Sequence, residues 1–93
     1  MARPCKNRCI HRDPHFTYFK PSGIPMTELK EVTLALDELE AIRLSDAEGL
    51  TATTAAQQMA ISRHTFGRIL KRGRQTIALA LLNGFAIQIE KEK

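Results

Sequence analysis

From about residue 36 onward, apolar residues recur every three or four positions in successive stretches, which is the spacing of helices with one buried face. The first stretch opens at Asp37, which together with Glu40 predicts an N-cap with a capping box, and Gly49 is suited to end it. A second, alanine-rich stretch, Ala52–Met59, follows Thr51, another residue that favours helix starts. Two helices are therefore predicted before residue 60.

A third and longer helix is predicted from Ser62, an N-cap residue, to Asn83 and Gly84. Its predicted core face is apolar for about five turns. The residues expected on that face are Phe66, Ile69, Leu70, Ile77 and Leu81.

Short strands are predicted on either side of these helices. Residues 15–20 are rich in aromatic side chains, and residues 85–90 alternate between apolar and polar ones. Between them, residues 27–31 suit a short helical turn and residues 32–34 an extended segment. The predicted fold is mainly α, a three-helix core flanked by N- and C-terminal strands, in which the final strand pairs with residues 16–19 or with a second chain.

The length of 93 residues suits one domain, predicted at residues 15–93 behind a basic, irregular arm at residues 1–14. The longest apolar run is far shorter than the roughly 20 residues of a membrane helix. The N-terminus shows no secretory signal pattern, and two cysteines suit a reducing compartment. A cytoplasmic protein without membrane attachment is expected.

Charge is strongly segregated along the chain. The net charge of +4 divides into +4 over residues 1–20, −5 over residues 21–50 and +5 over residues 51–89, where there is no acidic residue at all. Such a basic segment projects a positive field toward a polyanion such as nucleic acid. The alternative is that its cations pair with the acids of the middle segment.

The second and third predicted helices are separated only by a short turn at Ala60 and Ile61, which is the layout of a helix-turn-helix at about residues 51–82. Ala55 and Ala56 are small enough to let the two helices pack closely, and Ile61 would fill the angle between them. The third helix is then the recognition helix, with its first turns in the major groove of DNA.

On a helical wheel, every ionised residue opposite the core face of the third helix is positive, whereas a merely solvated face would carry mixed charge. These cations suit guanine edges and phosphates, and Gly67 permits close approach of the DNA backbone. Two further arginines are expected to reach phosphate only. The predicted DNA contacts are Arg63, His64, Gly67, Arg68 and Lys71, followed by the phosphate contacts Arg72 and Arg74.

Several segments resemble uncharacterised protein family 0251: Tyr-Phe-Lys-Pro at residues 18–21, Gly-Ile-Pro at 23–25, Leu-Asp-Glu-Leu-Glu-Ala at 36–41 and Ser-Arg-His-Thr-Phe-Gly-Arg-Ile-Leu at 62–70. The resemblance implies a small prokaryotic DNA-binding protein whose helical part is similar to region four of sigma factors. One departure is Ala60, where the family usually has glycine. A left-handed conformation there would cost alanine about 1–2 kcal/mol.

Cys5 and Cys9, with His11 and His15 nearby, form an alternative site in the arm. Such residues could hold zinc or a metal shared across a dimer, or act as a redox sensor, because the neighbouring cations lower thiol pKa values. The spacing is not that of the common zinc motifs, so free thiols are the competing interpretation.

Leu79 and Leu82 lie on the outward side of the third helix, where they predict either a homodimer interface or packing under the arm or strands. The resulting hypothesis is a homodimeric transcriptional regulator that binds specific double-stranded DNA sequences. The alternative is a module that docks on RNA polymerase through its acidic stretch and depends on Glu38 and Glu40. No catalytic motif is present, so an enzyme is not expected.

Overall fold

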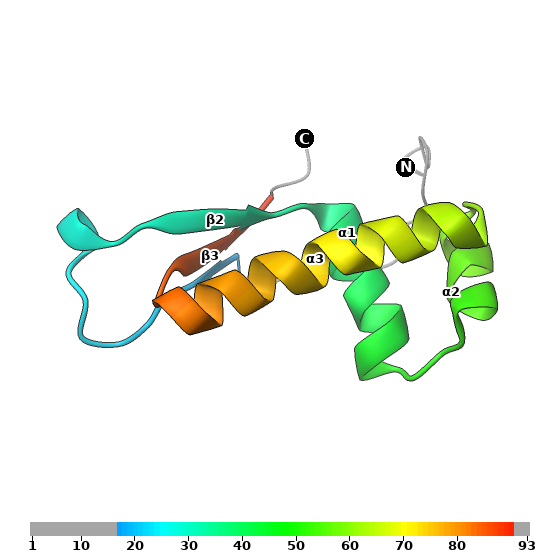
Figure 1. The fold of residues 1–93 in the computed structure, drawn as a ribbon, viewed down its shortest axis with the longest axis horizontal. Coiled ribbons are helices and arrows are strands. Elements are labelled where there is room, and N and C mark those ends of the chain that lie inside the picture. Colours follow the sequence, from blue (N-terminus) through cyan, green and yellow to red (C-terminus); the bar gives the residue numbers. More distant parts are fainter. Residues whose placement is uncertain (1–16, 91–93) are drawn as a thin grey trace, which may run out of the picture.

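The computed structural model describes residues 17–90, which form a mainly helical fold with a small sheet beside it (Figure 1). The predicted combination of helices and short strands is confirmed. In chain order the elements are β1 (Tyr18–Phe19), the 3₁₀ turn η1 (Met26–Glu28), β2 (Glu31–Leu34), α1 (Leu36–Ile42), the π-helical segment η2 (Arg43–Ala47), α2 (Ala52–Met59), α3 (Arg63–Asn83) and β3 (Ala86–Ile89).

The predicted boundaries of α2 and α3 are confirmed, because local side chains fix them. The Thr51 hydroxyl accepts a hydrogen bond from the Thr54 backbone N–H at 3.2 Å, and the Ser62 hydroxyl accepts one from the Thr65 N–H at 3.1 Å. Each bond satisfies a backbone donor that the first helical turn leaves open. Gly84 ends α3 in the left-handed conformation, at φ 71°.

The predicted start of α1 at Asp37 is wrong. The helix begins at Leu36, behind Ala35, and the Ala35 N–H donates to the Glu38 carboxylate at 3.1 Å. Asp37 therefore lies inside the first turn, and Glu40 points into the interior instead of completing a capping box. After α1 the backbone continues as the π-helical segment η2. Gly49 follows this segment in the left-handed conformation, which is typical of a glycine at the end of a helix.

The sheet has the strand order β1-β3-β2, with β3 antiparallel to β1 and parallel to β2. The predicted pairing of the final strand with the aromatic segment is confirmed by Tyr18 opposite Gln88. The Tyr18 hydroxyl of β1 donates a hydrogen bond of 2.6 Å to the Glu31 carboxylate of β2. This bond raises the pKa of the Tyr18 phenol. The two outer strands are thus linked across β3.

The main core lies where α1, η2, α2 and α3 meet. Ala55 and Ala56 of α2 are buried there, and Ile61 packs against the same cluster. This agrees with the prediction that the two small alanines let α2 and α3 pack closely and that Ile61 fills the angle between them. The buried residues of this cluster are Ala41, Leu44, Ala55, Ala56, Met59, Phe66, Ile69 and Leu70.

Helices α1 and α3 approach each other closely at Gly73. A Cβ atom at this position would lie 3.0 Å from both the Glu38 Cβ and the Ile42 Cδ1, which is tighter than nine in ten contacts of Cβ atoms, so a neighbour would have to move. The missing side chain therefore sets how near the long helix lies to α1.

The predicted core position of Leu81 is wrong, because 77% of this residue is exposed. The second half of α3 packs against the sheet through Ala80, which is 2% exposed. The buried face of the helix therefore includes Ala80 and not Leu81. Leu79 and Leu82 are exposed, in keeping with their predicted outward positions.

Candidate nucleic-acid interface

The turn between α2 and α3 is held in one conformation by backbone hydrogen bonds. Ala60 adopts the left-handed conformation (φ 61°, ψ 42°), which glycine adopts freely and the Cβ atom of alanine disfavours. Its N–H donates to the Gln57 carbonyl at 3.1 Å, and the Ile61 N–H donates to the Ala56 carbonyl at 3.1 Å. The start of α3 is therefore placed rigidly relative to α2.

The first turns of α3 present an exposed cluster that is not neutralised within residues 17–90. Arg63, His64, Arg68 and Lys71 are exposed, and within that range their side chains form no hydrogen bond or ion pair. We call these four residues together with Gly67 the α3 basic face. A cationic face without internal partners is suited to an anionic ligand.

Gly67 lies on this face in open space. It is exposed, its backbone is helical, and an added Cβ would meet nothing within 4 Å. A glycine inside a helix costs about 0.5–1 kcal/mol relative to alanine. Packing within residues 17–90 gives no reason for glycine here, in contrast to Gly73.

The two predicted phosphate contacts Arg72 and Arg74 each have an acidic partner within the chain. Arg74 pairs with Asp46 of η2 through two bonds, from Nη2 to Oδ1 at 2.5 Å and from Nε to Oδ2 at 3.1 Å. This contact lowers the pKa of the Asp46 carboxyl and raises the pKa of Arg74. Arg72 Nε lies 3.6 Å from the Glu38 carboxylate. The alternative of pairing with the middle acids thus holds for these two cations.

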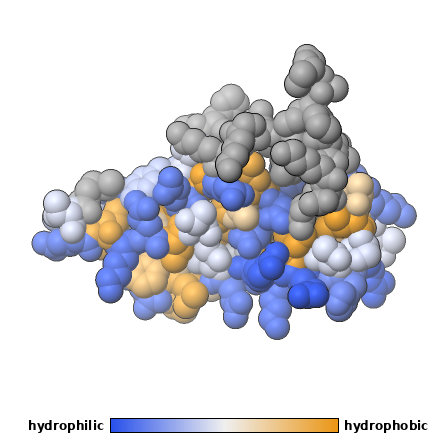
Figure 2. All heavy atoms as spheres, turned by 90° about the horizontal axis from the view of Figure 1, so that it is seen from above, coloured by the Kyte–Doolittle hydropathy of each residue, from blue (hydrophilic) through white to orange (hydrophobic). Residues whose placement is uncertain are grey.

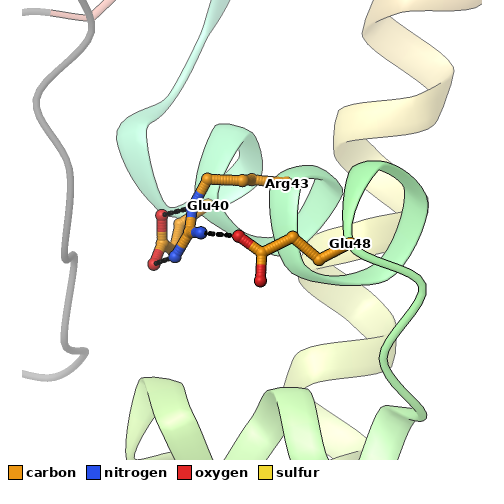
Figure 3. Close-up of polar contacts among 3 residues, drawn as sticks. All are labelled: Glu40, Arg43 and Glu48. Carbon is orange, nitrogen blue, oxygen red and sulfur yellow. Dashed lines mark hydrogen bonds and ion pairs between the residues drawn. The ribbon is translucent and has the colours of Figure 1, made fainter.

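A second ion-pair cluster closes the joint between α1 and η2 (Figure 3). The Arg43 guanidinium donates through Nε and Nη2 to the two Glu40 oxygens at 3.0 and 2.8 Å, and through Nη1 to Glu48. Glu40 is only 2% exposed, and its hydrogen bonds raise the pKa of Arg43. Because Glu40 is buried, its replacement would disturb the fold and is unsuited to test whether the acidic stretch docks on a partner.

Sequence reasoning missed these pairs for a simple reason. Asp46 and Arg74 are 28 positions apart, and the charge balance of the segments indicated only that some pairing was available. Among the cations of α3, those that remain exposed and without a partner within residues 17–90 are Arg63, Arg68 and Lys71.

The candidate metal ligands Cys5 and Cys9, and the whole predicted arm at residues 1–14, lie outside the described residues. Within residues 17–90, no group of three or more histidine, cysteine or acidic side chains is arranged to hold a metal ion. In the same range no helix has both the length and the apolar character needed to cross a bilayer.

Comparison with known proteins gives one consistent family. The model of a family described as "Protein of unknown function DUF134" matches residues 1–92. A UPF0251 protein of Pelotomaculum thermopropionicum is 55% identical over 96% of this chain and 67% of its own length. The UPF0251 protein of Desulfosudis oleivorans is 50% identical over 97% of this chain and 65% of its own, and that of Caldanaerobacter subterraneus subsp. tengcongensis is 53% identical over 97% and 76%.

The chain therefore spans about two thirds to three quarters of the length of these relatives. No solved structure matches it. The identity of about half of all residues over nearly the whole chain is far above the level at which a family is shared, and the chain belongs to the uncharacterised protein family UPF0251.

Proposed function

We propose that the protein binds specific sequences of double-stranded DNA and regulates transcription, with α3 as the recognition helix. The observation that carries this proposal is the α3 basic face. Its cations are exposed and without partners in residues 17–90, while the neighbouring Arg72 and Arg74 are paired with acids. Within α3, ion pairing to described residues thus leaves the unpaired positive charge in the first turns of the helix.

The helices around this face suit a helix-turn-helix of the kind in sigma factor region four. The capped start of α3 would enter the major groove, and α2 would cross the backbone beside it. Arg68 and Lys71 would reach guanine edges or phosphates, Arg63 a phosphate at the groove edge, and His64 a base or phosphate oxygen. Gly67 would lie where the sugar-phosphate edge comes closest.

The competing hypothesis, docking on RNA polymerase through the acidic stretch, receives less support from the contacts. Glu38, Glu40, Asp46 and Glu48 all form ion pairs within the chain. These four acids therefore offer a basic partner less free charge than unpaired acids would.

Capture of sheared genomic DNA by the purified protein at near-physiological salt, followed by sequencing, tests the proposal. We expect the retained fragments to share a motif. Arg68→Glu should abolish their retention, because it reverses a charge that faces DNA. Lys30→Glu, an exposed lysine outside α3, is the matched control with the same change in net charge and should retain them.

Uniform retention of all fragments would contradict sequence specificity, and equal loss in both variants would contradict the assignment of the face. A single helix-turn-helix supplies few contacts for a specific site, so the proposal includes binding as a homodimer.

A further inference from the structure

Helix α3 is divided into a charged and an uncharged half. Its five cations all lie in residues 63–74, and residues 75–83 include no ionisable side chain. In the uncharged half, Leu81 is 77% and Leu82 83% exposed. Figure 2 shows this division along the lower edge of the molecule, where apolar atoms lie at the left and hydrophilic atoms farther right. Exposed apolar groups gathered in this way mark an interaction surface.

An apolar hollow adjoins these leucines, between the end of α3 and the β1 edge of the sheet. Its volume is about 210 Å³. For comparison, an engineered apolar cavity of about 150 Å³ holds a benzene molecule. The hollow is therefore large enough for a leucine side chain. It is lined mainly by Phe19, Pro21, Leu81, Phe85 and Ile87.

We propose that the occupant is a second copy of this chain, bound through the uncharged half of α3 about a twofold axis, with Leu82 of each copy seated in the hollow of the other. A protrusion and a neighbouring hollow on one chain are what a twofold contact needs, because each copy then supplies both. Charge favours this region as well, since a contact between two α3 basic faces would bring like charges together.

The arrangement fits DNA, and this step rests on the proposed function. The Leu81–Leu82 contact lies about 14 residues, or about 21 Å along the helix, from the centre of the α3 basic face. Two collinear antiparallel copies would separate their basic faces by about 42 Å, and the usual crossing angles of packed helices shorten this distance. Successive major grooves on one side of DNA are about 34–36 Å apart.

Sedimentation velocity of the full chain without DNA tests the contact over a range of protein concentrations. We expect the wild type to be a dimer. Leu81→Glu should raise the dimer dissociation constant by about 100-fold or more, because it places a charged carboxylate in an apolar contact. Phe19→Ala, which removes a wall of the hollow, should weaken the dimer by about tenfold.

Ala52→Glu is the control. It places the same charge on an exposed apolar residue of α2, which is not among the residues that line the hollow, and should leave the dimer intact. Circular dichroism of each variant should match the wild type, because the replaced residues are exposed.

A monomeric wild type at all concentrations would overturn the proposal and leave the hollow to another segment or partner. A dimer that Leu81→Glu does not weaken would overturn the assigned surface. Neither result depends on DNA. Arg68→Glu, in contrast, should lose DNA binding and remain dimeric. Failure of the dimer proposal is therefore distinguishable from failure of the DNA-binding proposal. Among DNA fragments captured by the wild type, an inverted repeat with centres about 10 base pairs apart would add support.

Discussion

At the scale of single residues, Ala60 is held in a conformation that an L side chain disfavours. We predict that Ala60→Gly stabilises the fold by about 0.5–1 kcal/mol, since relief of the left-handed strain exceeds the greater entropy of glycine in the unfolded chain. The residue is exposed, so loss of its methyl group removes little packing. Urea denaturation followed by circular dichroism measures the difference.

Ala52→Gly is the matched control for that prediction, because Ala52 is also exposed and lies in α2 with ordinary helical geometry. There the same replacement should destabilise the protein by about 0.5–1 kcal/mol. If both variants lost stability equally, the left-handed turn would carry no strain.

Gly67 combines two opposite expectations. Gly67→Ala should stabilise the fold by about 0.5–1 kcal/mol, because the new methyl group meets no atom and alanine favours the helix. The same methyl group should weaken DNA binding several-fold if the backbone of DNA lies against this position. Denaturation and fluorescence anisotropy with a captured duplex measure the two effects. An unchanged affinity would place the DNA backbone farther from α3.

At the scale of elements, the Arg74–Asp46 pair links η2 to α3. Because the pKa of Asp46 is lowered in the fold, its ionised form stabilises the protein above the unfolded pKa of about 4, and this contribution is lost as the pH falls through the folded pKa. Asp46→Asn should therefore reduce stability at pH 7, by less than about 1 kcal/mol for so exposed a pair, and the difference should vanish in acid.

Thermal denaturation between pH 7 and pH 2.5 measures this difference. The double variant Asp46→Asn with Arg74→Gln completes the cycle and isolates the coupling between the two side chains. A difference from wild type that stays constant with pH would show that the pair contributes nothing through its charge.

The elements differ in how well the sequence predicts them. The starts of α2 and α3 depend on Thr51 and Ser62, whose signals lie within three residues of the bonds that they make. The sequence pattern places the start of α1 one residue or more too late. The residue that precedes the helix is Ala35, whose N–H is bound by the Glu38 carboxylate, and alanine is not a residue type that signals a helix start. The parallel pairing of β2 with β3 joins residues that are far apart in the sequence, such as Glu31 and Ala86, and the local pattern does not encode it.

At the scale of the whole molecule, the exposed basic face predicts DNA binding that depends steeply on salt. Each phosphate neutralised contributes a slope of about −0.9 to the logarithm of affinity against the logarithm of salt concentration. Binding should therefore weaken strongly between about 50 and 200 mM salt, and Lys71→Gln should reduce the slope by about one per bound copy. Anisotropy titrations with a captured duplex provide the slopes, and a flat response would contradict phosphate contact.

The sequence predicts which residues of the candidate site are exposed, but not which of them pair with other parts of the chain. The helical wheel separated polar from apolar positions on α3 correctly at its first half, so the exposed residues of the α3 basic face were found in advance. The wheel is wrong for Leu81, which lies beside the sheet without being covered by it. It also contains no information on the acids of α1 and η2 that pair with Arg72 and Arg74.

The position of β3 in the sheet has a consequence for synthesis on the ribosome. Both of its neighbours, β1 and β2, precede it in the chain, and neither pairs with the other. All four helical segments from α1 to α3 can form from contiguous sequence, but the sheet has no central strand until residues 86–89 have left the exit tunnel. Until then the apolar residues of the two outer strands are unprotected, which exposes the nascent chain to aggregation or to binding by chaperones.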